Sequence, residues 1–113
     1  MEGIETIQYA DFTKLDLRVG EIELVEEIEG ADKLYKITID LGREKRIVCA
    51  GLKEYYSKDE LEGKRIVLLY NLQPRMMRGI ESNGMMLAAV TDDDKKVALL
   101  TPDKEIELGS KIF

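Results

Sequence analysis

Alternating apolar and polar residues, the period of a β-strand with one buried face, dominate the patterning of this 113-residue chain. The stretch from residue 35 to 41 is the clearest case, because Tyr35, Ile37, Ile39 and Leu41 are separated by single polar residues. The pattern predicts a mostly β protein in which one face of each strand is buried.

Further strands are predicted at residues 17–24, 46–50, 64–70, 85–91 and 95–100. The phase of the first one slips around Gly20, where we expect a bulge or a sharp bend. Residues 41–44 supply the turn that precedes the strand at 46–50. The run Asp92–Asp94 is typical of a hairpin loop between the last two strands.

Helix signals are few and short. Ser57 and Glu60 have the spacing of a capping box, and Gly63 ends the predicted helix. Residues 11–14 can form one more turn before the first strand. Five strands with a short helix between the third and the fourth match the all-β OB-fold barrel. We expect one domain over 1–113, with an N-terminal extension at 1–10 and a C-terminal extension at 101–113.

Histidine is absent and Cys49 is the one cysteine, so no intramolecular disulfide, ordinary zinc site or imidazole-based catalytic site can form within one chain. The longest apolar run, residues 85–90, is far shorter than the roughly 18 residues of a membrane span, and no signal segment opens the chain. Asp92–Asp94 lacks the spaced ligands of a calcium loop. We therefore predict a cytoplasmic protein with no metal and no cofactor, in which the commonest catalytic sites are excluded and only catalysis by carboxylates or lysines remains open.

The charge is uneven along the chain. Residues 1–32 have a net charge of −8, residues 33–85 of +4 and residues 86–113 of −2, within a total of −6. The overall acidity argues against binding nucleic acid by bulk charge. The basic middle permits a local positive face, although chance clustering of solvated charge explains it equally well.

The segment 71–79 is unusual because it follows the most apolar strand and combines two arginines, two methionines and a proline. Pro74 cannot continue a central strand, so we expect a loop there. Arg75 and Arg78 suit phosphate contacts and base stacking, which indicates an RNA surface. The alternative is that Met76 and Met77 cap the barrel core while the arginines are simply solvated.

Asn83 and Gly84 form a turn pair directly after this segment. We expect Ser82 and Asn83 to expose hydrogen-bonding groups beside the arginines. A plain hairpin turn is the alternative interpretation.

Four strings in order carry a resemblance to a known family: Asp11 to Gly20, Ala31-Asp32-Lys33-Leu34, Asn71-Leu72-Gln73-Pro74 and Glu81-Ser82-Asn83-Gly84-Met85. Together they resemble the tRNA-binding domain of methionyl-tRNA synthetases, found as a C-terminal domain or a beta subunit. The family also includes free-standing structure-specific tRNA-binding proteins and the cytokine-like domain of multisynthetase complexes. The resemblance runs from about Asp11 to Phe113.

The resemblance implies an OB fold, usually homodimeric, that binds the folded shape of tRNA with little sequence preference. It places tRNA contacts on Lys33, Asn71, Arg75, Arg78, Ser82 and Met85, with Met76 as a lesser candidate. Gln73 completes the predicted site, standing where the family commonly has lysine, so that one phosphate-directed charge is missing.

We therefore expect a non-catalytic tRNA-binding protein, either the beta subunit of a split methionyl-tRNA synthetase beside its catalytic subunit or a stand-alone factor. The alternative is an OB-fold protein–protein scaffold without direct RNA contact. The candidate surface for a homodimer consists of the apolar side chains near the two ends, Ile4, Ile7, Tyr9, Phe12, Ile106, Leu108, Ile112 and Phe113.

Overall fold

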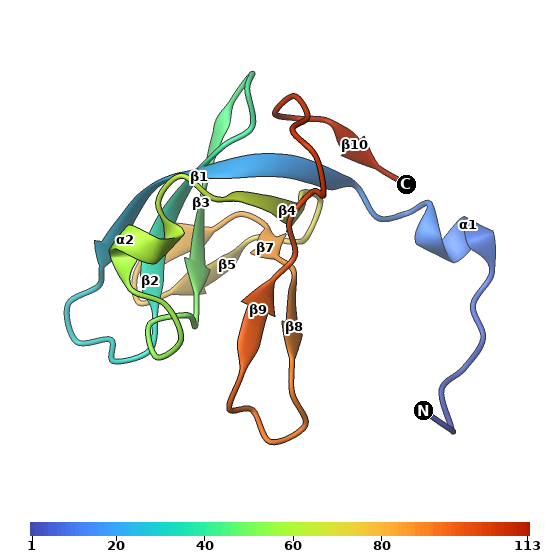
Figure 1. Cartoon of the computed structure of the whole chain (residues 1–113), viewed down its shortest axis with the longest axis horizontal. Coiled ribbons are helices and arrows are strands. Elements are labelled where there is room, and N and C mark those ends of the chain that lie inside the picture. Colours follow the sequence, from blue (N-terminus) through green and yellow to red (C-terminus); the bar gives the residue numbers. More distant parts are fainter.

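Antiparallel strands curl into the near-closed, five-stranded barrel that the alternating pattern predicts (Figure 1). The computed structural model describes residues 1–113. The sheet has the order β3-β2-β1-β4-β7, and β10 pairs with β1 outside this path. The strands are β1 (Leu17–Glu27), β2 (Tyr35–Asp40), β3 (Lys45–Ala50), β4 (Arg65–Leu69), β7 (Met85–Met86) and β10 (Lys111–Ile112). The OB-like fold class is thereby confirmed.

The long strand β1 joins the two halves of the barrel. Its first part pairs with β4 and its second part with β2, so it must bend between them. The change of partner falls at Glu21, next to Gly20, where a bulge or a sharp bend was expected, and the register shift itself lies slightly later, between Ile22 and Leu24. Gly20 serves close packing, because a Cβ at this position would lie 2.5 Å from Cγ2 of Ile39.

The barrel interior is filled by the inward-facing residues of the alternating strands. Ile22, Ile37, Ile39, Ile66 and Leu68 have no exposed surface, and each such side chain contributes about 1.5–3 kcal/mol by its burial.

The short helix α2 (Lys58–Leu61) lies between β3 and β4, as predicted, and contributes the fully buried Leu61 to the core. The Ser57 Oγ accepts a hydrogen bond from the Glu60 backbone N–H at 3.2 Å. The Glu60 carboxylate accepts one from the Ser57 N–H at 2.8 Å. The predicted capping box is therefore present.

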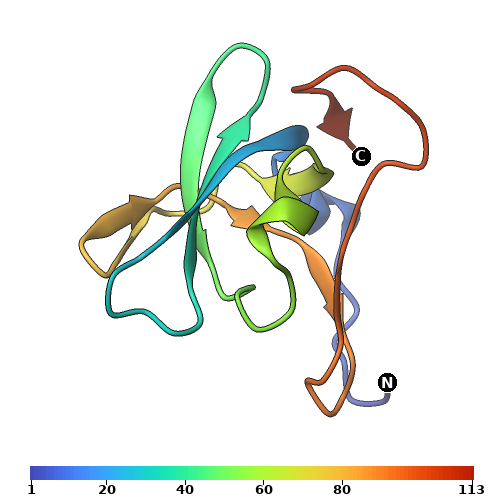
Figure 2. The same cartoon turned by 60° about the vertical axis from the view of Figure 1, so that its left-hand side comes forward.

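Two small hairpins stand outside the main sheet, and Figure 2 shows them projecting in different directions. Strands β5 (Arg75–Met77) and β6 (Ile80–Ser82) form a two-stranded ribbon, called the ribbon below. The expectation of an irregular loop after Pro74 is wrong for these residues. Strands β8 (Ala88–Val90) and β9 (Val97–Leu99) form the other hairpin, whose loop contains Asp92–Asp94 as predicted.

The N-terminal segment extends away from the barrel (Figure 1). It contains the one-turn helix α1 (Tyr9–Phe12), which begins two residues earlier than expected. Ile4, Ile7 and Tyr9 are 80%, 65% and 76% exposed, so these apolar side chains do not pack on their own barrel. Neither helix of the structure is long and apolar enough to cross a membrane.

Candidate nucleic-acid interface

The tip of the ribbon is a two-residue turn whose backbone is unusual for the residue it contains. Met77 pairs with Ile80, and both Arg78 (φ 52°) and Gly79 (φ 80°) have positive φ. Two positive φ angles define a type I′ turn, in which Asn-Gly is the favoured pair. An arginine in the left-handed region costs about 1–2 kcal/mol. The exposed Arg78 side chain is thus held at the tip of the ribbon at a conformational cost.

The two faces of the ribbon have different roles, because side chains alternate along each strand. Arg75 lies opposite Ser82 on the face toward the barrel. Met76 lies opposite Glu81 on the outer face, with Met76 68% exposed. Neither arginine of the ribbon has a carboxylate within ion-pair distance. Their charges are therefore available to an anionic partner.

The ribbon is attached to the edge of β3 by two hydrogen bonds. The Cys49 backbone N–H donates to the Ser82 Oγ at 2.9 Å, and the Asn83 N–H donates to the Ile47 carbonyl at 2.8 Å. Ser82 is only 6% exposed, so the expectation of an exposed hydroxyl is wrong. The turn expected at Asn83–Gly84 lies instead at the ribbon tip, and Gly84 is buried between β6 and β7.

A cavity of about 260 Å³, called the ribbon cavity below, lies between the ribbon, the end of β3 and β7. It brings together four of the predicted site residues, Gln73, Arg75, Ser82 and Met85. Its other lining residues are Cys49, Ala50, Gly51, Leu52, Leu72, Met77, Gly84, Met86, Ala88 and Leu99. The cavity therefore joins the polar residues of the predicted site to apolar walls that the sequence analysis did not assign to it.

Cys49, the one cysteine of the chain, is half-buried and lines this cavity. Strand alternation explains this position, since Val48, which precedes Cys49 on β3, is the residue that enters the core. Burial raises the pKa of the Cys49 thiol, which keeps it in the neutral form at neutral pH.

Lys33 lies at the periphery of the cavity. Its carbonyl accepts a hydrogen bond from the Lys53 N–H at 3.2 Å, next to the lining residue Leu52. Its exposed ammonium is 3.9 Å from the Glu54 carboxylate, a loose surface pair that an incoming phosphate can displace.

Asn71 does not itself line the cavity, and its amide makes two hydrogen bonds within the chain. The Oδ1 atom accepts a hydrogen bond from the Asp16 N–H at 2.9 Å, and the Nδ2 group donates to the Lys14 carbonyl at 2.8 Å. Both partners belong to the segment between α1 and β1, so the side chain ties the end of β4 to the start of the barrel. These two hydrogen bonds hold the backbone after β4 in place.

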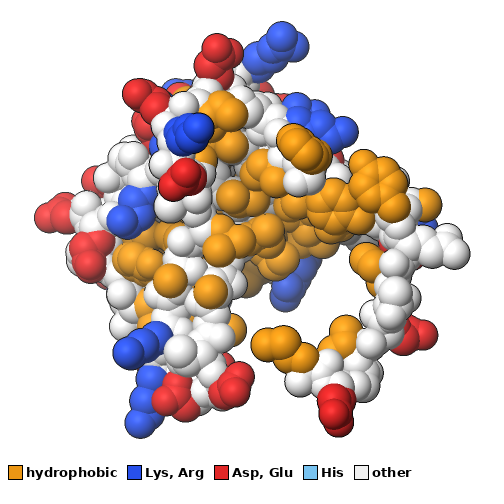
Figure 3. Space-filling view, turned by 45° about the vertical axis from the view of Figure 1, so that its right-hand side comes forward, with side chains coloured by type: hydrophobic (Ala, Val, Ile, Leu, Met, Phe, Trp, Pro, Cys, Tyr) orange, Lys and Arg blue, Asp and Glu red, His pale blue; other side chains and the backbone are white.

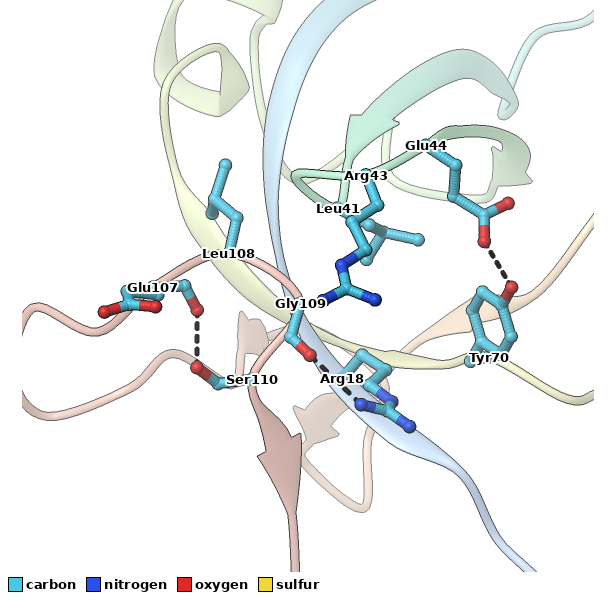
Figure 4. A pocket seen from close by; sticks show the side chains of 9 residues that line it. All are labelled: Arg18, Leu41, Arg43, Glu44, Tyr70, Glu107, Leu108, Gly109 and Ser110. Atoms are coloured by element: carbon cyan, nitrogen blue, oxygen red, sulfur yellow. Dashed lines mark hydrogen bonds between the residues drawn. The ribbon is translucent and has the colours of Figure 1, made fainter.

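A larger cavity, of about 530 Å³, lies between the β2–β3 turn and the C-terminal segment (Figure 4). Its lining contains charges of both signs, Arg18 and Arg43 with Glu44 and Glu107, and several of these groups are already engaged. Arg18 donates to Asp16 and to the Gly109 carbonyl, and the Tyr70 hydroxyl donates to Glu44. The hydrogen bond from Tyr70, together with one from Arg46, lowers the pKa of Glu44. The ribbon cavity, lined by the unpaired Arg75 and by no carboxylate, is the better candidate for an anionic ligand.

Comparisons with known proteins identify the family of this chain. Residues 17–111 match the family model described as "Putative tRNA binding domain". The chain is 54% identical to methionine–tRNA ligase of Thermococcus onnurineus (strain NA1) over 109 residues, which is 96% of this chain but 15% of that enzyme. The chain thus spans only a small part of the curated relatives it matches.

Two solved structures superimpose along their whole length. The methionyl-tRNA-synthetase-related protein of Pyrococcus horikoshii has a TM-score of 0.91 and 33% identity, covering 97% of this chain and 100% of that one. The CsaA chaperone of Picrophilus torridus has a TM-score of 0.85 and 38% identity, covering 96% and 100%. With the family model matched over nearly the whole barrel and these folds superimposed on it, the chain belongs to the tRNA-binding domain family.

Proposed function

We propose that this chain binds folded tRNA, without catalysing a reaction itself, through the ribbon and the adjacent cavity. The observation that carries the proposal is the pair of unpaired arginines, Arg75 and Arg78, of which Arg78 occupies a strained turn position at an exposed tip. Strain of this kind concentrates at functional sites, and guanidinium groups suit phosphate recognition. Because the chain is acidic overall, it cannot rely on bulk positive charge, and RNA binding requires a local basic site of this kind.

Within this proposal the predicted residues divide into two groups. Lys33, Gln73, Arg75, Met76, Arg78 and Met85 contact the RNA directly. Asn71 and Ser82 act through the backbone that they hold in place. Few charges and several fixed short side chains favour a rigid three-dimensional RNA shape over a flexible strand.

The test compares a fluorescently labelled tRNA with an unstructured RNA of equal length by fluorescence anisotropy. We expect tighter binding of the tRNA, and weaker binding of tRNA by Arg75→Ala. Arg43→Ala is the matched control, because Arg43 is also exposed and unpaired but lies on the β2–β3 turn. Equal affinity for the two RNAs, or equal loss in both variants, contradicts the proposal.

We also propose that the chain assists a methionyl-tRNA synthetase catalytic chain as its tRNA-binding part. Identity of 54% to a 15% portion of that enzyme supports this partner. Adding the chain to a synthetase that lacks such a domain should lower KM for tRNA and leave kcat nearly unchanged. An unchanged KM indicates a stand-alone role.

A protein-binding role is the second candidate, favoured by the apolar side chains that remain exposed at both ends, such as Ile4 and Phe113 (99% exposed). We propose that these side chains form the interface of a symmetric homodimer and are not a docking site for other proteins. Dimerisation would extend the RNA-binding surface. The anisotropy assay described above distinguishes a tRNA-binding protein from a protein–protein scaffold, since a scaffold module does not bind tRNA.

A further inference from the structure

The ribbon cavity is lined mostly by apolar residues, with one arginine beside them. Of its 14 lining residues, nine are hydrophobic. Arg75 is the one charged residue of the lining, and no lining residue is acidic. This absence of carboxylates is notable in a chain with 23 acidic residues. Apolar walls beside an unpaired guanidinium favour an occupant that has an apolar face and is attached to negative charge.

The size of the cavity limits the occupant. Its volume of about 260 Å³ lies below the roughly 300–1,000 Å³ of pockets for drug-sized ligands. At about 30 Å³ for each water-sized group, the cavity holds about nine such groups. This number is similar to the roughly eight to eleven non-hydrogen atoms of a nucleobase. One planar ring system is close to this size, and because the cavity is open to solvent the attached sugar and phosphate remain outside it.

The wall chemistry suits a ring as well. Met77, Met85 and Met86 supply polarisable thioethers, which make favourable contacts with aromatic rings. Gln73 and Arg75 at the rim supply hydrogen-bond donors for a base edge or for the neighbouring phosphate.

We propose that the ribbon cavity accepts one unstacked base of the bound RNA, with Arg75 on the sugar–phosphate backbone beside it. The inference rests on the proposed tRNA binding and adds a subsite to it. Apolar walls contact the faces of any base, so the subsite does not distinguish one base from another. It instead requires a nucleotide that is unpaired and can leave the base stack. It thereby supplies a physical reason for binding folded tRNA, whose loops expose such bases, in preference to a duplex.

The first experiment fills the cavity from an exposed strand. Ala88 on β8 lines the cavity opposite Leu99, whereas Ala89 points to the other face and does not line it. Both are exposed, so Ala88→Phe and Ala89→Phe should fold with similar melting temperatures. We expect Ala88→Phe to weaken tRNA binding about 5- to 150-fold, the equivalent of losing one stacked base, and Ala89→Phe to bind normally.

The outcomes separate this inference from the function on which it rests. Wild-type protein that does not bind tRNA contradicts the proposed function. Wild-type protein that binds tRNA, together with Ala88→Phe binding equally well, overturns the base subsite and leaves tRNA binding intact.

The second experiment needs no substitution, because the single thiol of the chain, Cys49, lines the cavity. Its alkylation by iodoacetamide is followed by mass spectrometry at mildly alkaline pH, alone and with saturating tRNA or a fully paired RNA duplex. We expect tRNA to slow the modification and the duplex to leave it unchanged. Equal protection by both RNAs, or protection by neither, overturns the proposal.

An apolar peptide is the third arm of this experiment. We expect it to leave the alkylation rate of Cys49 unchanged. If the peptide protects Cys49 and displaces tRNA, the cavity is a peptide site and the base subsite is wrong.

Discussion

At the scale of single residues, Asn71 illustrates how one amide can hold together two parts of the chain that are distant in sequence. Its amide spans from the end of β4 to the backbone of Lys14 and Asp16, more than fifty residues earlier in the chain. The loop that leads into the ribbon starts at the same point. The orientation of that loop therefore depends on a tether to the segment that follows α1.

Asn71→Ala should lower the free energy of unfolding by about 1–2 kcal/mol, because it removes two hydrogen bonds worth about 1 kcal/mol each. The amide proton of Asp16 should also exchange faster with solvent, since its acceptor is lost. Urea unfolding and hydrogen exchange measure the two effects.

Gln73→Ala is the matched control for this prediction. Gln73 is an exposed amide two residues further along, and its side chain makes no hydrogen bond, so its stability should stay within about 0.5 kcal/mol of wild type. If Asn71→Ala is as stable as wild type but loses tRNA affinity, Asn71 contacts the RNA directly.

At the scale of elements, one substitution in the ribbon turn should change stability and tRNA affinity in opposite directions. Arg78→Asn replaces a strained residue by the one that a type I′ turn prefers, so stability should rise by about 0.5–1 kcal/mol. Affinity for tRNA should nevertheless fall by about fivefold or more, the worth of one charge-assisted contact. Thermal unfolding and anisotropy measure both.

Arg78→Lys keeps a positive charge at the tip and serves as the comparison. It should retain more of the tRNA affinity than Arg78→Asn while gaining no stability. If the Arg78→Asn variant is more stable and keeps full tRNA affinity, the tip of the ribbon is not part of the RNA interface.

The barrel elements were accessible to prediction because each has a strong local signal. Alternation located β2, β3 and β4, and the capping box located α2. The ribbon has no comparable signal, because three-residue strands are too short to show a period and Pro74 indicates a loop. The buried Ser82 and the tethered Asn71 depend on partners 33 and 55–57 residues away, which no local pattern encodes.

At the scale of the whole molecule, the exposed apolar ends predict a symmetric dimer. Figure 3 shows apolar side chains gathered over the face around which the N-terminal segment arches. The double variant Ile7→Ser with Phe113→Ser should convert a dimer into a monomer, because both side chains are largely exposed in the single chain.

Light scattering at micromolar concentration measures the mass of each protein. Leu24→Ser is the control, an exposed apolar residue on β1 away from the ends, and should remain dimeric. A monomeric wild type contradicts the dimer, and a dimeric double variant moves the interface elsewhere.

The small number of available cations predicts a shallow salt dependence. If Lys33, Arg75 and Arg78 each neutralise one phosphate, the logarithm of the binding constant should fall with the logarithm of salt concentration with a slope of about −2 to −3. Arg75→Ala should reduce this slope by about one, whereas Arg43→Ala should not change it. A slope several times steeper means that a broader basic surface is used. Titrations of tRNA at a series of salt concentrations provide the slope.

The separation of the ribbon from the main sheet has an evolutionary consequence. The ribbon forms its own two-stranded sheet and is attached to β3 through the backbone at Asn83 and the hydroxyl of Ser82. Its outward positions, such as Met76 and Glu81, make no contribution to the barrel core. Mutations there can accumulate without a folding penalty, so the same barrel is able to diversify its ligands while its core is inherited unchanged.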